Sequence, residues 1–244
     1  AEKLRVALKN LGWRRNGMTW LHSEPDRQIV FLGDFIDRGP ETAAVIRIVR
    51  ELMDAGRAQA IMGNHELNAI HFHTNDPDKG TPLRVHDKHN LEQHESFLRE
   101  FPLGASQTQD VLDWMRGLPL FIETEEFRAV HAAWIQSAID RLKRLTGSGI
   151  LSDEQLIRVG RKGDDLHGLV EAVAKGPEAR LPHPHSFQDK CGRVRHHVRV
   201  KWWSDDAESW RQVSMSVPDV NQLPDEPLPD DLFGAIYPAE DKPV

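Results

Sequence analysis

The sequence lacks the features of disulfide-bonded, membrane-spanning and broadly nucleic-acid-binding proteins. Cys191 is its one cysteine, so the chain forms no internal disulfide, and we expect this thiol to be inert. No signal peptide is visible, so a reducing cytoplasm is the expected compartment. No run of about 18 apolar residues is present, which argues against a transmembrane helix. The net charge of −7 is the opposite of the basic excess shown by proteins that wrap nucleic acid.

The first part of the chain is predicted to form a βαβ unit. We expect a helix over Glu2–Leu11, then a buried strand over Gln28–Leu32, a helix from Pro40 to about Ala55, and a second buried strand over Ala58–Met62. Strands that alternate with helices predict an α/β sheet. In such sheets ligands bind at the carboxyl ends of the strands.

The remainder is predicted to hold a cap-like insertion at about residues 72–116, a mostly helical middle and a β-rich end. We interpret residues 1–244 as a single domain with this insertion. The expected elements are helices over Asn90–Phe101 and Gln107–Met115, strands over Leu120–Glu123 and Phe127–His131, helices within Ile135–Lys175, strands over Val194–Trp203 and Arg211–Val217, and an extended surface segment over Pro218–Asp231.

A polar motif stands directly after each strand of the βαβ unit. The first is Gly33-Asp34-Phe35-Ile36-Asp37-Arg38-Gly39, and the second is Gly63-Asn64-His65-Glu66. A two-metal hydrolase holds two cations about 3.5–4 Å apart, and one carboxylate bridges them. Asp34 follows a strand and a flexible glycine, so it is placed to be that bridge. Asn64 offers an amide oxygen, and this mixture of donors suits Mn, Fe or Zn.

Three further side chains of these motifs have roles in the predicted chemistry. His65, next to Asn64, could face the leaving group and protonate it as a general acid. Asp37 is a candidate to hydrogen-bond and orient His65. Arg38 can bind the phosphate in a bidentate fork, which a lysine could not match.

The other histidines differ in what their positions indicate. His131 ends its own predicted strand, and is therefore the best candidate for a further metal ligand. His71 and His73 flank Phe72 after the second motif, which leaves open whether they line the cleft. We expect the histidines of the insertion to be solvated, namely His86, His89 and His94. The two C-terminal histidine pairs are expected on the surface: His183 with His185, and His196 with His197. We expect three tryptophans to lie in the core: Trp202, Trp203 and Trp210.

The two motifs resemble those of the calcineurin-like metallophosphoesterases, and are most similar to the serine/threonine protein phosphatase branch. That branch includes bacterial diadenosine tetraphosphatases and the phosphatase part of bacterial polynucleotide kinase-phosphatases. The resemblance implies a four-layer α/β/β/α sandwich of mixed sheets with a helical insertion. It also implies that Asp34 bridges two metals, that Asn64 and His131 bind one of them, that His65 is the acid with Asp37 as its partner, and that Arg38 clamps the phosphate.

Two motifs of the resembled family are absent from the sequence. These are an Asp-x-His-Gly after the first strand and a Gly-His pair near the end, which supply further metal ligands. Glu2–Leu11 resembles the helix that follows the Asp-x-His-Gly motif. Ala239–Val244 resembles the approach to the strand that carries the Gly-His pair. Because the retained motifs are intact, we interpret the chain as a fragment of a full enzyme in preference to a degenerate relative.

The sequence therefore predicts a metal-dependent phosphoesterase that cleaves phosphate esters or anhydrides. Two divalent ions are the implied cofactors, with Mn favoured and Fe or Zn also suitable. The expected substrates are phosphorylated small molecules, nucleotides or phosphoproteins, and no membrane partner is expected. One alternative is a non-catalytic phosphate-binding or interaction module derived from the same fold. Another is a nucleic-acid end phosphatase, for which the basic and aromatic stretch Arg193–Trp203 is the only internal support.

Overall fold

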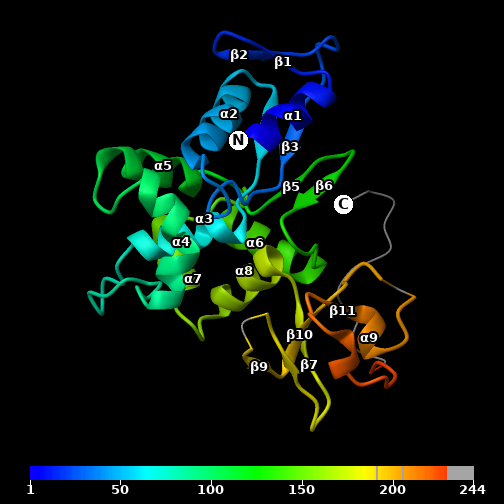
Figure 1. Cartoon of the computed structure of the whole chain (residues 1–244). Coiled ribbons are helices and arrows are strands. Elements are labelled where there is room, and N and C mark those ends of the chain that lie inside the picture. The colour runs from blue at the N-terminus through cyan, green and yellow to red at the C-terminus, as the bar shows by residue number, and fades with distance from the viewer. Residues whose placement is uncertain (191, 205, 230–244) are drawn as a thin grey trace.

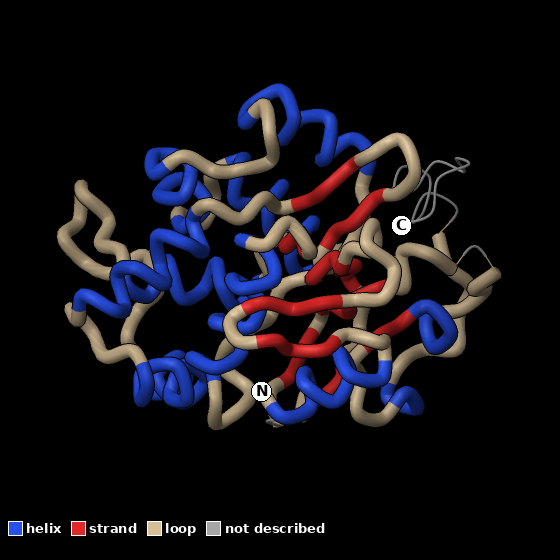
Figure 2. The backbone as a smooth tube through the Cα atoms, turned by 90° about the horizontal axis from the view of Figure 1, so that it is seen from above, coloured by secondary structure: helices blue, strands red, loops and turns tan. Residues whose placement is uncertain are grey.

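The computed structural model describes residues 1–190, 192–204 and 206–229, and shows a mixed α/β protein (Figures 1 and 2). The predicted α/β class is confirmed. Cys191, Asp231 and Ala239–Val244, for which we made predictions, lie outside the described residues. The helices are α1 (Glu2–Asn10), α2 (Thr42–Asp54), α3 (Asn64–His73), α4 (Lys88–Glu100), α5 (Ser106–Arg116), α6 (Gln136–Thr146), α7 (Asp153–Gly160), α8 (Asp165–Lys175) and α9 (Trp210–Val213).

The strands are short and pair in small sheets. They are β1 (Arg14–Asn16), β2 (Thr19–Leu21), β3 (Ile29–Phe31), β4 (Ala58–Ala60), β5 (Phe121–Glu123), β6 (Arg128–Val130), β7 (Glu178–Arg180), β8 (Phe187–Gln188), β9 (Val194–Arg195), β10 (His197–Val200) and β11 (Ser214–Met215).

The predicted βαβ unit is confirmed. Strands β3 and β4 pair in parallel, with Ile29 opposite Ala58 and Phe31 opposite Ala60. Helix α2 connects them and packs on β4. Parallel strands end at the same edge of a sheet, so the loop after β3 and the start of α3 after β4 lie side by side there (Figure 1).

Two apolar cores hold this unit in place. Leu8 of α1, Trp13, Trp20 of β2 and Leu52 of α2 are buried against the β3–β4 pair. A larger core lies among α3 to α8 and the antiparallel β5–β6 pair. Its members include Ile70, Phe97, Met115 and Trp134, whose side chains are fully buried. These cores fix both strand ends that carry the motifs.

The predicted insertion is built from two helices that pack against the rest of the protein. Asp87 caps α4 by accepting a hydrogen bond from the Asn90 backbone N–H at 2.8 Å. At its other end, the Glu100 carboxylate accepts from the backbone N–H groups of Thr42 and Ala43, at 2.7 and 3.1 Å. Those two groups stand at the start of α2, where backbone N–H groups have no acceptor within the helix. Helix α4 is therefore tied to the unit that carries the first motif.

The C-terminal residues form a separate small core, and here the sequence prediction is partly wrong. Strands β11, β10 and β7 make an antiparallel sheet that buries Val198, Val200 and Trp210. The strand predicted over Arg211–Val217 is instead the helix α9 followed by β11. The Gln212 side chain accepts from the backbone N–H of Ser209 at 3.1 Å, which starts a helical turn. The single-domain assignment of residues 1–244 stays a prediction.

Two other predictions for this region are also corrected. Trp210 is buried as expected, but Trp203 is 53% exposed. Pro218–Asp231 is not extended throughout, since residues Val220–Gln222 form a 3-10 turn and Leu223 is buried in the small core. In the part of the chain that the structure describes, no helix combines the length and apolar character needed to cross a bilayer.

Candidate functional site

The two motif loops approach each other so closely that only glycine fits at two positions. Gly33 has φ +87°, and a Cβ added to it would lie 2.4 Å from the backbone nitrogen of Gly63. A Cβ on Gly63 would lie 2.5 Å from the backbone nitrogen of Asp34. Asp34 and Asp37 themselves adopt positive φ of 58° and 71°, a strained conformation that aspartate tolerates better than most residues. This close approach brings the two motifs into one site.

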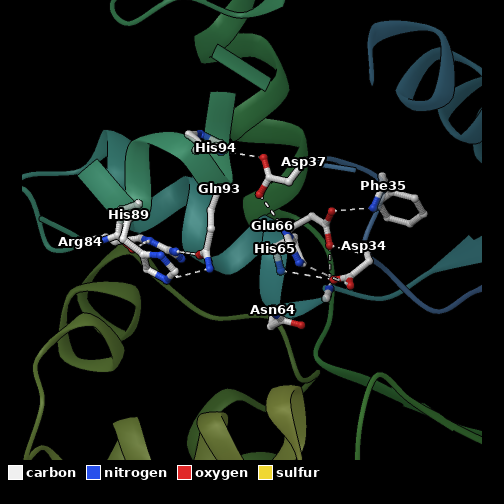
Figure 3. Close-up of polar contacts among 12 residues, drawn as sticks. Asp34, Phe35, Asp37, Asn64, His65, Glu66, Arg84, His89, Gln93 and His94 are labelled. Carbon is white, nitrogen blue, oxygen red and sulfur yellow. Dashed lines mark hydrogen bonds and ion pairs between the residues drawn. The ribbon is translucent and has the colours of Figure 1, made fainter. Parts of the chain in front are cut away.

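Glu66 joins the two loops, and sequence reasoning gave it no role. Its fully buried carboxylate accepts hydrogen bonds from the backbone N–H groups of Asp34 and Gly63, at 2.8 and 2.9 Å, on one oxygen. The other oxygen accepts from Phe35 at 2.8 Å (Figure 3). Burial raises the pKa of Glu66, although these three donors favour the charged form. One sequence signal could have predicted this role. Glu66 stands three residues after Gly63, a position at which an acidic side chain caps the start of a helix.

The three predicted metal ligands converge. Nε2 of His131 lies 3.3 Å from Oδ1 of Asp34 and 3.2 Å from Oδ1 of Asn64. The start of α3 also points here, since the backbone N–H of His65 donates to Asp34 Oδ1 at 3.3 Å. Asp34, Asn64 and His131 come from the ends of β3, β4 and β6 respectively.

The chemistry of this donor set fits a cation. Nδ1 of His131 donates to the Leu32 carbonyl, so in the neutral ring Nε2 carries a lone pair. That lone pair faces oxygen lone pairs of Asp34 and Asn64, an arrangement that a doubly protonated ring or a bound cation would satisfy. Among the described residues, no group of three His, Cys, Asp or Glu side chains could hold a metal. Asp34, Asn64 and His131 offer three donors, enough to contribute to one ion of the predicted pair, and their role as ligands stays a prediction.

The predicted acid and its partner are in contact. Nδ1 of His65 lies 2.8 Å from Oδ2 of Asp37, and both side chains are largely buried. The hydrogen bond to Asp37 raises the pKa of His65, against burial and the nearby charge of Arg38. Burial raises the pKa of Asp37, but hydrogen bonds from His65 and His94 outweigh it and lower that pKa overall. Arg38 itself is exposed. With Nδ1 engaged, His65 presents Nε2, which lies 3.9 Å from Asp34 Oδ2.

His94 also belongs to this cluster, and the prediction that it is solvated is wrong. It is 4% exposed, and its Nδ1 lies 2.8 Å from Oδ1 of Asp37. Its Nε2 lies 3.3 Å from Nε2 of His73. The solvated prediction failed because the face of α4 that carries His94 is turned inward, toward Asp37 (Figure 3). Sequence spacing alone does not give that orientation.

Other histidines lie away from the donor set. His71 contacts the Leu156 carbonyl at 2.9 Å, and burial lowers its pKa to about 4, so it is a core residue. His86 stacks on Phe72 with ring centroids 3.8 Å apart. His183, His196 and His197 are exposed, as predicted.

A large apolar cavity lies beside the site, on the other edge of β3 and β6. Its volume is about 630 Å³, and Val30, Leu32, Val130 and Trp202 line it. Among the described residues that line it, Arg128 is the one charged side chain, and none is a carboxylate or a histidine. This lining offers no group for acid–base chemistry, so we place no reaction step there.

Comparison with known proteins agrees with this geometry. The family model for calcineurin-like phosphoesterases matches residues 12–223. The symmetrical bis(5'-nucleosyl)-tetraphosphatase of Janthinobacterium sp. (strain Marseille) is 32% identical over 157 residues, which cover 63% of this chain and 43% of that protein.

Two asymmetrical bis(5'-nucleosyl)-tetraphosphatases, both named PrpE, are also similar. That of Bacillus velezensis is 33% identical over 99 residues, covering 41% of this chain and 36% of the relative. The PrpE protein of Oceanobacillus iheyensis is 37% identical over 91 residues, which cover 37% of this chain and 33% of the relative. The chain thus matches less than half the length of these curated relatives. Members of the matched family use a dinuclear divalent metal centre. Since the family model covers most of the sequence, the chain belongs to the calcineurin-like phosphoesterase family.

Proposed function

We propose that this protein hydrolyses nucleoside polyphosphates with the help of divalent metal ions. One observation carries the proposal: the donors of Asp34, Asn64 and His131 converge next to a buried Asp37–His65 pair. A metal-facing set beside an acid–base pair is what phosphoryl transfer to water requires. The relatives are named bis(5'-nucleosyl)-tetraphosphatases, which supports nucleotides as the substrate class.

In this proposal Asp34, Asn64 and His131 would hold the ions, with the Asp34 carboxylate shared between them. A divalent pair bound there supplies Lewis acidity and an activated water. We propose Mn²⁺, since carboxylate, amide and imidazole donors suit it, as they also suit Fe or Zn.

The remaining steps use the side chains of the chain itself. Arg38 binds the phosphoryl oxygens with its planar guanidinium. His65 donates the proton on Nε2 to the departing oxygen, while its Nδ1–H stays hydrogen-bonded to Asp37. Asp37 holds the ring in the tautomer and orientation that this transfer needs.

The alternatives have less support. A non-catalytic module would not need the Asp37–His65 pair, which lies buried beside the metal-facing atoms. The end-phosphatase alternative depended on Arg193–Trp203, but β9 and β10 within it belong to the C-terminal sheets, and Val198 and Val200 pack in the separate small core.

The test is metal binding and metal-dependent hydrolysis by this chain. We expect calorimetric titration to show Mn²⁺ binding that is weakened in His131→Ala, and we expect Mn²⁺-dependent release of phosphate from diadenosine tetraphosphate and p-nitrophenyl phosphate. Asp34→Asn should lower both the bound metal and the rate. A chain that binds no Mn²⁺, or whose Mn²⁺ content is the same in Asp34→Asn, would contradict the proposal.

Arg84 supports a substrate with more than one phosphate. Its Nε donates to Asn90 Oδ1 at 3.1 Å and its Nη2 to Gln93 Oε1 at 2.7 Å. Within the described ranges no carboxylate lies within ion-pair distance of it. Burial lowers the pKa of Arg84, while the charges of Asp37, Asp87 and Glu171 act on it in the opposite direction. A half-buried guanidinium held by neutral oxygens is suited to bind a further phosphate.

Arg84→Gln should weaken the binding of diadenosine tetraphosphate selectively. A charge-assisted hydrogen bond contributes about 1.5–3 kcal/mol, so KM for this substrate should rise about tenfold or more. KM for p-nitrophenyl phosphate, which has one phosphate, should change much less. Arg99→Gln on the exposed face of α4, where Arg99 pairs with Glu95, is the charge-matched control. Equal changes for both substrates would argue against a second phosphate site.

A further inference from the structure

We propose that His94 is a positioning residue for the general acid: it holds the Asp37 carboxylate in the orientation that His65 needs. This inference rests on the proposed function, because it concerns the same proton transfer. The sequence offered no reason to connect His94 with the motifs, since it lies in the insertion and 57 residues beyond Asp37.

Asp37 is held from two sides. Its Oδ2 accepts from Nδ1 of His65 and its Oδ1 from Nδ1 of His94, each at 2.8 Å. The Asp37 side chain is only 4% exposed, so water does not replace either donor readily. Figure 3 shows His65 and His94 on either side of this carboxylate. Loss of the His94 bond would leave one buried carboxylate oxygen without this partner, and rotation of the carboxylate would then disturb the bond to His65.

A second histidine contacts the other ring nitrogen of His94. Nε2 of His94 lies 3.3 Å from Nε2 of His73, so one of these two atoms donates and the other accepts. Burial lowers the pKa of His73 to about 4, which leaves His73 neutral near pH 7 and able to donate through Nε2–H. His94 then accepts on Nε2 and donates through Nδ1, as the contact with Asp37 requires. Hydrogen bonds thus run from His73 through His94 to Asp37.

The position of His94 is fixed by packing as well. Its ring stacks on Phe97 at a centroid distance of 4.7 Å and an interplanar angle of 17°, and lies 4.9 Å from the ring of Phe72. Phe97 is fully buried in the larger core among α3 to α8. The same helix is anchored through Glu100 to the start of α2. The donor that faces Asp37 is therefore carried by a rigid element, which is what a positioning group requires.

The experiment separates the hydrogen bond from the packing by using two substitutions. His94→Phe keeps an aromatic ring against Phe97 and Phe72 but removes the N–H. His94→Asn places an amide N–H near the position of Nδ1 and removes most of the ring. His86→Phe is the control, because His86 stacks on Phe72 from the same insertion and has no contact with Asp37 among those that the described residues make.

We expect His94→Phe to lower kcat on phenyl phosphate about 10- to 100-fold, as is typical when the partner of a functional histidine is disturbed. KM should stay within about twofold, because no substrate contact is lost. On 2,4-dinitrophenyl phosphate, whose leaving group needs no proton, the loss should be much smaller. His94→Asn should restore most of the rate on phenyl phosphate. Equal losses on both substrates, or an Asn variant as slow as the Phe variant, would overturn the proposal.

A second readout does not depend on activity. The Nδ1–H proton of His65 that is bonded to Asp37 should give a downfield NMR signal, identified by its loss in His65→Ala. We expect this signal to shift or disappear in His94→Phe and to persist in His94→Asn and His86→Phe. A signal unchanged in His94→Phe would refute the positioning role, whether or not the wild-type chain is active. Inactivity of the wild-type chain would instead count against the proposed function.

Discussion

His65→Ala is expected to slow the hydrolysis of phenyl phosphate about 10²- to 10⁴-fold, which is the usual contribution of a general acid. The departing phenoxide of this substrate is a poor leaving group, so its departure depends on the proton from Nε2 of His65. On 2,4-dinitrophenyl phosphate the same variant should lose little, since that leaving group departs as a stable anion. The measurement is kcat for both substrates at saturating Mn²⁺.

The comparison of substrates distinguishes acid catalysis from damage to the site. Loss of metal or of fold would slow both reactions alike, because both need the attack of water. Asp37→Asn should show a weaker form of the same selectivity, since it disturbs the orientation of His65 without removing the ring. His196→Ala, at an exposed position, should leave both rates unchanged. If His65→Ala slows the two substrates equally, His65 is not the acid.

Glu66→Ala is expected to destabilise the protein by at least about 3 kcal/mol, because three buried backbone N–H groups lose their acceptor at once. Each unsatisfied buried donor costs about 1–3 kcal/mol. Glu66→Gln should cost less, since its one carbonyl oxygen can still accept from Asp34 and Gly63 while its NH₂ faces the Phe35 N–H. The measurement is urea unfolding followed by tryptophan fluorescence.

The same two variants should also weaken Mn²⁺ binding, since Asp34 lies on one of the two loops that Glu66 joins. Glu126→Gln provides the matched control: it makes the same chemical change at an exposed position. We expect it to leave the unfolding midpoint within about 0.5 kcal/mol of wild type. A Glu66→Ala protein as stable as this control would show that the loops are held together by other contacts.

Local patterns were sufficient to predict the βαβ unit and the place of its motifs. Short apolar runs that end in glycine predicted β3 and β4 within one or two residues, and parallel pairing followed from the helix between them. The structure also brings Asp34, Asn64 and His131 together, while their role as metal ligands stays a prediction. Such features depend on residues close in sequence or on the common direction of strand ends.

Other features depended on contacts that no local pattern records. His94 was expected in solvent because it lies in the insertion, and only the packing of α4 against the rest of the protein turns that histidine to Asp37. Arg84 was not singled out at all, since its significance comes from the neutral oxygens of Asn90 and Gln93 that hold it, and these contacts form only in the folded chain. The start of α9 was mistaken for a strand, because four residues offer too little periodicity to read.

The sequence by itself was enough to predict which side chains carry the chemistry, because metal ligands and acids are limited to a few residue types and the motifs stand at strand ends. Only the tertiary structure decided how that chemistry is held in place. Glu66 joins the two motif loops across 31 residues of sequence, and His94 reaches Asp37 across 57. Both are buried polar groups whose partners are set by packing, and packing depends on the whole chain.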